Sequence, residues 1–496
     1  RDTDLFQLAL GLLPPWLVKD CQFSVSEQRL DLYIDFAKGG SFTCADCGQA
    51  GCPAYDTEER TWRHLNFFQH ETYLHARVPR AECPQCGVKT VAVPWARPGS
   101  GFTLLFEALV MTLVRQMPVR AASRIVGEHD TRLWRIVHHY VGAARAQADL
   151  SGVRRVGIDE TASRRGHHYI SVFVDLDRAK VVHVAPGKDG DTVASFAEDL
   201  TAHGGAASQV EEVCIDMSPA FQAGVREHLP AARITFDKFH VTRLLNQAVD
   251  QVRRAEQGQR AELKRTRYLW LKNRRHLTVG QRARLADLED RRLNLKTARA
   301  LRLRESFQDF YDQPPEWAGA YLKRWYFWAT HSRLAPLIDV ARTIREHQDG
   351  ILRWFQTRVT NGLLEGINSL IQAAKAKARG YRTLNNLMVM VYLVAGKLDF
   401  ETELAIVISE EHINDNQIET PQSWNLFAYV RNNPINLIDP TGEAIYYTHS
   451  VLEALDNAAR SLSPTHNQTL SQFEGPDALN VLVGFGDAGK DPNGRN

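Results

Sequence analysis

VRRVGIDETASRRGHHYISVFVDLDRAKVVHVAPG, from Val153 to Gly187, sets the architecture of the largest part of this 496-residue chain. It contains three short runs rich in Val, Ile, Phe and Tyr, a composition typical of β-strands. The segments between these runs are short enough for hairpin connections. We therefore predict three consecutive strands that pair with one another and begin a sheet.

Helical and strand-like segments alternate after this stretch. A helical pattern begins at Thr192, VEEVCIDM is strand-like, a second helical pattern begins at Pro219, and ARITFDKFHV supplies a fifth strand. Helices that connect strands cover the faces of the sheet. Residues 241–350 are almost wholly helical in pattern, and one or two more helices follow over 351–398. We predict an α/β domain over residues 151–400, with a long helical insertion at about 241–350.

Two aspartates follow hydrophobic strand patterns in this domain. Asp159 in VGIDETA and Asp216 in VEEVCIDMSPAF each stand where a strand pattern ends. Neighbouring strands can bring such carboxylates close together, where they repel each other and their pKa values rise unless a cation joins them. Mg²⁺ prefers oxygen ligands and binds through one or two carboxylates together with substrate phosphates. We therefore predict a magnesium site at Asp159 and Asp216.

A third carboxylate stands in an otherwise basic segment, TNGLLEGINSLIQAAKAKARGYR. Glu365 is the only acidic residue between Asp349 and Asp399, an interval that contains seven Lys and Arg. On a helix, one polar face would carry Glu365, Asn368, Gln372, Lys375 and Arg379. This face predicts Glu365 as a metal ligand, and Lys375 and Arg379 as contacts to a phosphate backbone. The alternative is a solvated amphipathic helix with a surface glutamate.

Two C-x-x-C pairs lie in the N-terminal part of the chain, and we predict that residues 1–98 form a zinc-binding domain. Each pair can offer two thiolates to one tetrahedral ion, so a structural Zn²⁺ is expected at Cys44, Cys47, Cys83 and Cys86. Cys52 and His64 lie between the pairs and could replace a ligand. The alternative is a set of reduced thiols without metal.

The segment MPVRAASRIVGEHDTRLWRIVHHYV follows, and its pattern is helix, turn, helix. Gly127 marks the turn, and the second helix has an apolar stripe at i, i+3, i+4 and i+7. Arg132, Arg135 and His139 fall off this stripe, where they can contact DNA. We predict a helix-turn-helix DNA-binding region over residues 99–150; the alternative is a helical hairpin that only packs on the next domain.

These residues together resemble a known family. Asp159, Asp216 and Glu365 look like the DDE triad of transposases, and residues 5–400 resemble transposases of the ISL-three family of bacterial insertion sequences. The resemblance rests on the cysteine pairs, the helix-turn-helix, and the strings LGLLPPW, RHLNF, GIDE, IDMSPAF, FDKFHV and NGLLEGINSLIQAAKAKARGYR.

The resemblance implies a multidomain α/β protein whose catalytic domain has an RNase H-like mixed β-sheet. It also implies that the triad holds two Mg²⁺ or Mn²⁺ ions, which activate water and then a DNA 3′-hydroxyl for attack on phosphodiesters. The partners would be double-stranded DNA at transposon ends and target, and a homo-oligomer on DNA. We further expect Lys238 to contact phosphate; Asp237 and His240 either line the site or have a structural role.

The distribution of charge agrees with a nucleic-acid partner. Residues 1–400 contain 56 Lys and Arg against 44 Asp and Glu, whereas residues 401–496 contain 4 against 14. A basic body with an acidic tail indicates a nucleic-acid-binding protein joined to a segment of different origin. No apolar run reaches the roughly 18 residues of a membrane span, so we expect no contact with a membrane. The resemblance to transposases of bacterial insertion sequences implies a cytoplasmic, nucleoid-associated protein.

The acidic tail has its own resemblance. NLFAYVRNNPINLIDPTGE, from Asn425 to Glu443, resembles the end of the Rhs repeat-associated core. We interpret residues 401–496 as a linker and a weakly structured tail, fused to the transposase-like part. Because the chain begins at Arg1 and not Met, we expect its natural start upstream. The alternative function is therefore a catalytically inactive, DNA-binding relic of a transposase.

Overall fold

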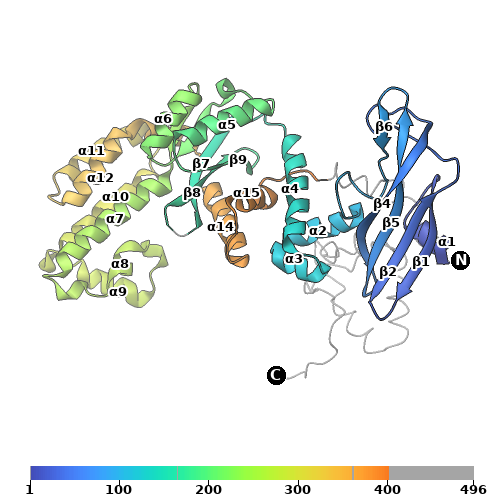
Figure 1. Cartoon of the computed structure of the whole chain (residues 1–496). Helices are drawn as coiled ribbons and strands as arrows, with labels where there is room; N and C mark the ends of the chain where they lie inside the picture. The colour runs from blue at the N-terminus through green and yellow to red at the C-terminus, as the bar shows by residue number, and fades with distance from the viewer. Residues whose placement is uncertain (1, 165, 360–361, 401–496) are drawn as a thin grey trace, which may run out of the picture. The chain divides into compact units, whose positions relative to one another are not determined.

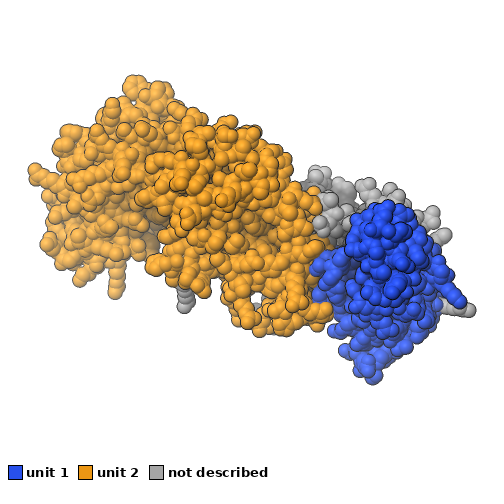
Figure 2. Space-filling view, turned by 45° about the horizontal axis from the view of Figure 1, so that its top comes forward, with its two compact units in different colours: residues 1–109, 405–496 blue, residues 110–404 orange. Residues whose placement is uncertain are grey.

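The structure is a computed structural model that describes residues 2–164, 166–359 and 362–400. The described residues form two compact units, 2–109 and 110–400, coloured separately in Figure 2. The segment for which we predict the linker and the Rhs-like tail, 401–496, lies outside the described residues.

The first unit is built on a six-stranded sheet with order β1-β2-β5-β4-β3, in which β6 pairs with β5. All neighbouring strands are antiparallel except β2 and β5. Alternate residues of β2 are buried, and Leu30, Leu32 and Ile34 belong to the core of this unit. The elements are α1 (Asp2–Ala9), β1 (Trp16–Ser24), β2 (Arg29–Phe36), β3 (Ser41–Phe42), β4 (Cys52–Phe67), β5 (His70–Cys83) and β6 (Gly87–Thr90).

Three helices lead into the second unit: α2 (Leu104–Gln116), α3 (Val119–Val126) and α4 (Asp130–Ala146). Helix α3 ends at Gly127, whose φ of +73° lies in the left-handed region that glycine adopts without strain. The apolar stripe of α4 is buried, as the periodicity predicts: Leu133, Ile136, Val137 and Tyr140. The predicted helix-turn-helix is therefore present as α3, a tight turn and α4.

A five-stranded sheet forms the centre of the second unit, with order β11-β10-β7-β8-β9. Figure 1 labels three of its strands, β7, β8 and β9. Strands β7, β8 and β9 are antiparallel neighbours, which confirms the predicted hairpins. Strand β10 is parallel to β7, and β11 is parallel to β10. The strands are β7 (Arg155–Arg164), β8 (His168–Asp175), β9 (Lys180–Pro186), β10 (Glu212–Ile215) and β11 (Arg233–Phe236), and the helices before and after β10 are α5 (Gly190–Ala202) and α6 (Pro219–His228).

Different helices cover the two faces of this sheet. On one face, Val156 and Ile158 of β7 belong to a core shared with α5 and α6. On the other face, strands β8 and β9 pack against α14 (Gly362–Lys377) and α15 (Leu384–Ala395). Gly157 is required at this second face, because a Cβ there would clash with Leu364 of α14.

The predicted insertion is helical and lies between β11 and α14. Its core contains the fully buried Trp270, Trp325 and Phe307. None of the helices in the described ranges is long and apolar enough to cross a membrane. The helices of this segment are α7 (Lys238–Gln257), α8 (Arg267–Leu271), α9 (Val279–Leu288), α10 (Lys296–Phe310), α11 (Pro315–Thr330), α12 (Ala335–Glu346) and α13 (Gln348–Thr357).

Candidate functional site

Three aspartates belong to three adjacent parallel strands of the second sheet: Asp159 lies within β7, and Asp216 and Asp237 directly follow β10 and β11. Cys214 of β10 pairs with Gly157 of β7, so the register places Asp216 beside Asp159. On the other side of β10, the backbone N–H of Asp237 donates to the carbonyl of Ile215 at 3.0 Å. Asp159, Asp216 and Asp237 therefore follow one another across β7, β10 and β11.

Asp159 lies within β7 and not at its end. Pairing of β7 with β10 stops at Gly157, but β7 continues to Arg164 as the partner of β8. This corrects the expectation that the strand ends at Asp159. Because side chains alternate between the faces of a strand, Asp159 shares the face of Gly157, which is the face that α14 covers.

The polar face of α14 contacts β7 residue by residue. Asn368 Nδ2 donates to Asp159 Oδ2 at 2.8 Å. One turn later, Gln372 Nε2 donates to Thr161 Oγ1 at 2.6 Å. Lys375 Nζ then donates to the carbonyl of Ala162 at 2.7 Å. The amide of Asn368 is a contact that the sequence analysis did not assign, although its position on the same helical face as Glu365 is visible in the sequence.

Glu365 is exposed in the first turn of α14. It lies one turn before Asn368 on the same face, so the helix that carries it is the one that contacts Asp159. The three carboxylates do not form a closed coordination set: within the described ranges, the only group of three or more His, Cys, Asp or Glu whose ligand atoms lie within 4.8 Å of one another is a set of cysteines. The structure thus brings Asp159 and Asp216 to neighbouring strands, and Glu365 lies on α14, the helix whose Asn368 bonds Asp159.

The environment of Asp159 disfavours its negative charge. Burial raises the pKa of Asp159 to about 6, and the nearby carboxylates of Asp216 and Asp237 also raise it. The charge of His240 and the backbone N–H of Glu160 act in the opposite direction. A nearby cation would favour the charged form of this carboxylate.

Asp237 and His240 form a pair at the start of α7. The Asp237 side chain is fully buried and caps the helix, because its Oδ2 accepts the backbone N–H of His240 at 3.3 Å. The same oxygen accepts a hydrogen bond from His240 Nδ1 at 2.8 Å. Burial is the largest effect on the pKa of His240 and lowers it, but the hydrogen bond to Asp237 and the negative charges of Asp159 and Asp237 together raise the pKa overall.

The three residues predicted to contact phosphate, Lys238, Lys375 and Arg379, differ in their surroundings. Lys238 is partly buried, with Nζ 5.1 Å from the ring centre of Trp354, and Lys375 is bonded to Ala162. Arg379 does not continue the polar face of α14, because the helix ends at Lys377 and Arg379 has a φ of +57°. The expected single face from Glu365 to Arg379 is wrong at this residue. The turn forms because the backbone N–H of Gly380 bonds to the carbonyl of Lys375.

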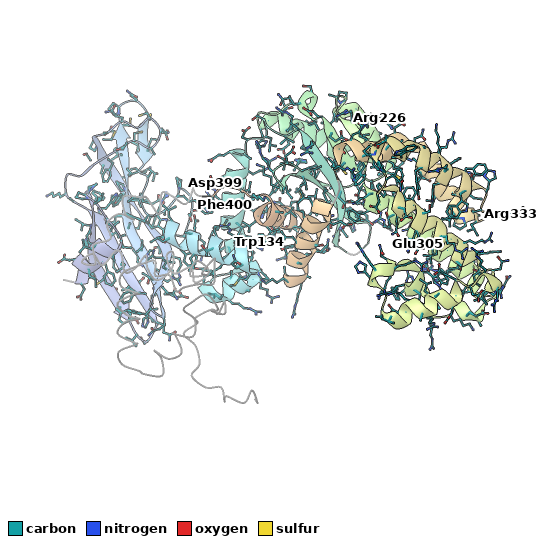
Figure 3. All side chains as sticks on the ribbon, turned by 180° about the vertical axis from the view of Figure 1, so that it is seen from behind. Trp134, Arg226, Glu305, Arg333, Asp399 and Phe400 are labelled. Carbon is teal, nitrogen blue, oxygen red and sulfur yellow. The ribbon has the colours of Figure 1, made fainter. Side chains whose placement is uncertain are left out.

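The predicted DNA contacts on α4 are unequally available. Arg135 and His139 are exposed, whereas Arg132 Nη1 donates to Glu128 Oε2 at 2.6 Å. Another side of α4 is covered: Trp134, labelled in Figure 3, has its ring centre 6.1 Å from that of Tyr381. His138 Nε2 lies 2.8 Å from Asn386 Oδ1 of α15. Of the three predicted residues, Arg135 and His139 are thus the ones without a charged protein partner in the described part of the chain.

The four predicted zinc ligands lie together in the first unit. The ligand atoms of Cys44, Cys47, Cys83 and Cys86 all lie within 4.8 Å of one another. Gly48 and Gly87 follow the two pairs with φ values of +73°. Backbone N–H groups of Cys86 and Gln85 lower the pKa of Cys83 to about 6, which favours the thiolate that zinc binds. Four sulfurs without an open position suit a structural zinc ion.

The two substitute ligands lie outside this group. Cys52 is buried, with its Sγ 3.4 Å from the carbonyl of Gln49. His64 Nδ1 lies 2.9 Å from Thr103 Oγ1, and burial lowers the pKa of His64 to about 4. Each side chain therefore already has a partner in the protein.

Comparison with known families covers the same three parts of the chain. Residues 156–391 match a family described as a transposase with a DDE domain of the ISL3 type. Residues 91–141 match the helix-turn-helix domain of transposase family ISL3. Residues 41–92 match the zinc-finger of the transposases of IS204, IS1001, IS1096 and IS1165.

Two relatives are similar over most of the chain. The transposase for insertion sequence element IS1557 of Mycobacterium tuberculosis is 29% identical over 431 residues, which cover 79% of this chain and 95% of the relative. The transposase for insertion sequence element IS1001 of Bordetella parapertussis is 30% identical over 350 residues, which cover 68% of this chain and 85% of the relative. This chain is a DDE transposase and belongs to the ISL3 family.

Proposed function

We propose that this transposase cleaves DNA at the ends of its insertion sequence and joins the freed 3′ ends to target DNA, with Asp159, Asp216 and Glu365 as its metal-binding carboxylates. The observation that carries the proposal is the register of β7 and β10, in which the paired Gly157 and Cys214 each lie two residues before an aspartate. The raised pKa of Asp159 supports it, because burial disfavours the negative charge of this carboxylate and a divalent cation would compensate for that cost.

The proposal includes an RNase H-like fold for the catalytic domain. The strand order β11-β10-β7-β8-β9 supports this assignment. So do the directions, with three antiparallel strands followed by two that run parallel to the first. The helical segment between β11 and α14 then corresponds to an insertion before the last acidic residue.

Asp159, Asp216 and Glu365 would hold Mg²⁺ or Mn²⁺, and their donor set of oxygens fits such hard cations. When bound, two such ions stabilise the attacking and leaving oxygens of an in-line phosphoryl transfer. The chain itself positions the carboxylates. Asn368 orients Asp159, and the backbone N–H of Ser218 donates to Asp216 Oδ1 at 2.9 Å.

DNA would be held by the helix-turn-helix and by basic residues around the carboxylates. Arg135 and His139 are exposed on α4 and suit contacts in a DNA groove, with Arg132 as a weaker contributor because Glu128 holds it. Lys238, Lys375 and Arg379 would contact phosphates. We further propose a homo-oligomer on DNA, located in the bacterial cytoplasm with the nucleoid.

The test is nicking of a supercoiled plasmid that carries the DNA flanking the gene. Nicks should form with Mg²⁺ or Mn²⁺ and should be absent with EDTA. Binding to the flanks without nicking under any metal condition would contradict the proposal and correspond to the inactive relic.

A further inference from the structure

The N-terminus of α7 lies at the carboxylate edge of the sheet. Asp237 is both the residue that follows β11 and the cap of α7. The first turn then contains Lys238 and His240 and no acidic residue. Positive side chains at a helix N-terminus oppose the helix dipole, so helix stability does not explain them. A bound polyanion would, because helix N-termini favour phosphate.

The His240 ring is fixed in one orientation. Its Nδ1 donates to Asp237 Oδ2, and that same oxygen accepts the backbone N–H of His240. Since Asp237 is fully buried, the pair cannot swing out without breaking the helix cap. The second ring nitrogen, Nε2, has no hydrogen-bond partner among the described residues. The imidazole is therefore positioned by the protein and retains one group for a ligand.

The ring also lies beside the proposed metal site. Its charge is close enough to Asp159 to lower the pKa of that carboxyl group, and Asp159 in turn helps to raise the pKa of His240. Arg243, one turn along α7, opposes the charge on His240. His240 thus lies at the sheet edge that carries Asp159 and Asp216, bonded to Asp237 at the end of the adjacent strand.

We propose that His240 is a catalytic residue that donates a hydrogen bond from Nε2 to the scissile phosphodiester, and that Asp237 is its positioning residue. The proposal rests on the proposed function, because it places a phosphodiester at Asp159 and Asp216. No bond is made or broken by His240: the proton stays on the ring and stabilises negative charge on a non-bridging oxygen. The alternative is a pair that only caps α7.

The experiment compares His240→Gln with wild type in single-turnover cleavage of a duplex from the gene flanks. Loss of one preorganised donor at a developing negative charge lowers a rate by about 10²- to 10³-fold. We expect that loss in rate, with a smaller change in the DNA concentration for half-maximal rate, since a transition-state contact affects turnover more than binding.

His183→Gln is the matched control. His183 has a similar side-chain exposure, 10% against 14% for His240, and also bonds an aspartate, with Nδ1 2.9 Å from Asp199 Oδ2. It lies on β9, away from the carboxylate edge. Thermal unfolding of each variant shows whether it is folded. A His240→Gln rate close to that of wild type, or an equal loss in folded His183→Gln, would overturn the proposal. Asp237→Asn should show a smaller loss, because its amide oxygen still accepts from Nδ1.

A second readout separates this inference from the proposed function. If the wild-type protein does not cleave, the proposed function fails. The role of His240 can still be tested by measuring the affinity for the flank duplex with and without Ca²⁺. We expect the gain in affinity with Ca²⁺ to be about tenfold smaller in His240→Gln, the effect of one charge-assisted hydrogen bond. An equal gain in both proteins would overturn the role of His240 in phosphate binding.

Discussion

Asn368 donates a hydrogen bond of 2.8 Å to Asp159, and the two residues are 209 positions apart in the chain. The bond fixes one oxygen of Asp159 and joins β7 to the helix that carries Glu365. This hydrogen bond therefore joins Asp159 to the helix that carries Glu365, the last of the three proposed metal-binding carboxylates. Its removal should affect the geometry of the site more than the stability of the fold.

Asn368→Ala is accordingly predicted to slow DNA cleavage by about tenfold and to lower the free energy of unfolding by only about 1 kcal/mol, the typical value of one hydrogen bond. Gln372→Ala is the matched control, because Gln372 bonds Thr161 one turn further along the same face. Single-turnover cleavage and denaturant unfolding measure the two quantities. Equal cleavage rates in the two variants would show that the Asn368 contact has no special role.

The pKa of Asp159 makes metal-free stability depend on pH. Because the folded-state pKa is about 6, above the ordinary value of 3.8, folding favours the protonated form. This contribution is complete below about pH 4 and is lost as pH rises through about 6. Asp159→Asn removes the charge, so in EDTA it should stabilise the protein by about 2 kcal/mol at pH 8 relative to its effect at pH 4. Denaturant unfolding of both proteins at the two pH values tests this, and an effect independent of pH would contradict it.

The zinc site predicts a defined metal content. Purified protein should contain about one zinc per chain, because four thiolates complete one tetrahedral site. Cys83→Ser should lose the metal, whereas Cys52→Ser should retain it, since Cys52 is outside the group of four sulfurs. Elemental analysis gives the answer directly. Retention of zinc by Cys83→Ser together with its loss from Cys52→Ser would require a different ligand set.

DNA binding should depend on the exposed residues of α4. Arg135→Ala is expected to lower affinity and to reduce the dependence of log K on log salt by about one unit, as for the loss of one phosphate contact. Arg132→Ala should have the smaller effect, because Arg132 already pairs with Glu128 at 2.6 Å. Fluorescence anisotropy at several salt concentrations measures both slopes. The opposite order of effects would place Arg132 on the DNA.

Features that depend on short sequence spacing could be predicted. The three paired strands of residues 153–187, the buried stripe of α4 and the two cysteine pairs each follow from local periodicity or from a fixed motif. The strand patterns also predicted Asp159 and Asp216 as site residues, but the predicted strand ended at Asp159. The pairing of β7 with β8 beyond Gly157 is what extends the strand.

Features that depend on tertiary register could not be predicted. The polar face of α14 was extended to Arg379 because periodicity does not show where Gly380 ends the helix. Likewise, the sequence left the role of Asp237 and His240 open. Only the parallel pairing of β11 with β10 brings Asp237 next to Asp216, and residue spacing contains no information on that pairing.

The most direct test of the central claim is metal-dependent cleavage of the flank duplex by Asp159→Asn, Asp216→Asn and Glu365→Gln, with Glu160→Gln as control. Glu160 is adjacent to Asp159 but on the opposite face of β7, where it pairs with Lys188. The three variants should each lose about a thousandfold in rate, since a metal site contributes several kcal/mol to the transition state, and should still bind the duplex. The control should cleave like wild type. A folded Glu365→Gln that cleaves within about tenfold of wild type would contradict the claim, because the third carboxylate would then lie elsewhere.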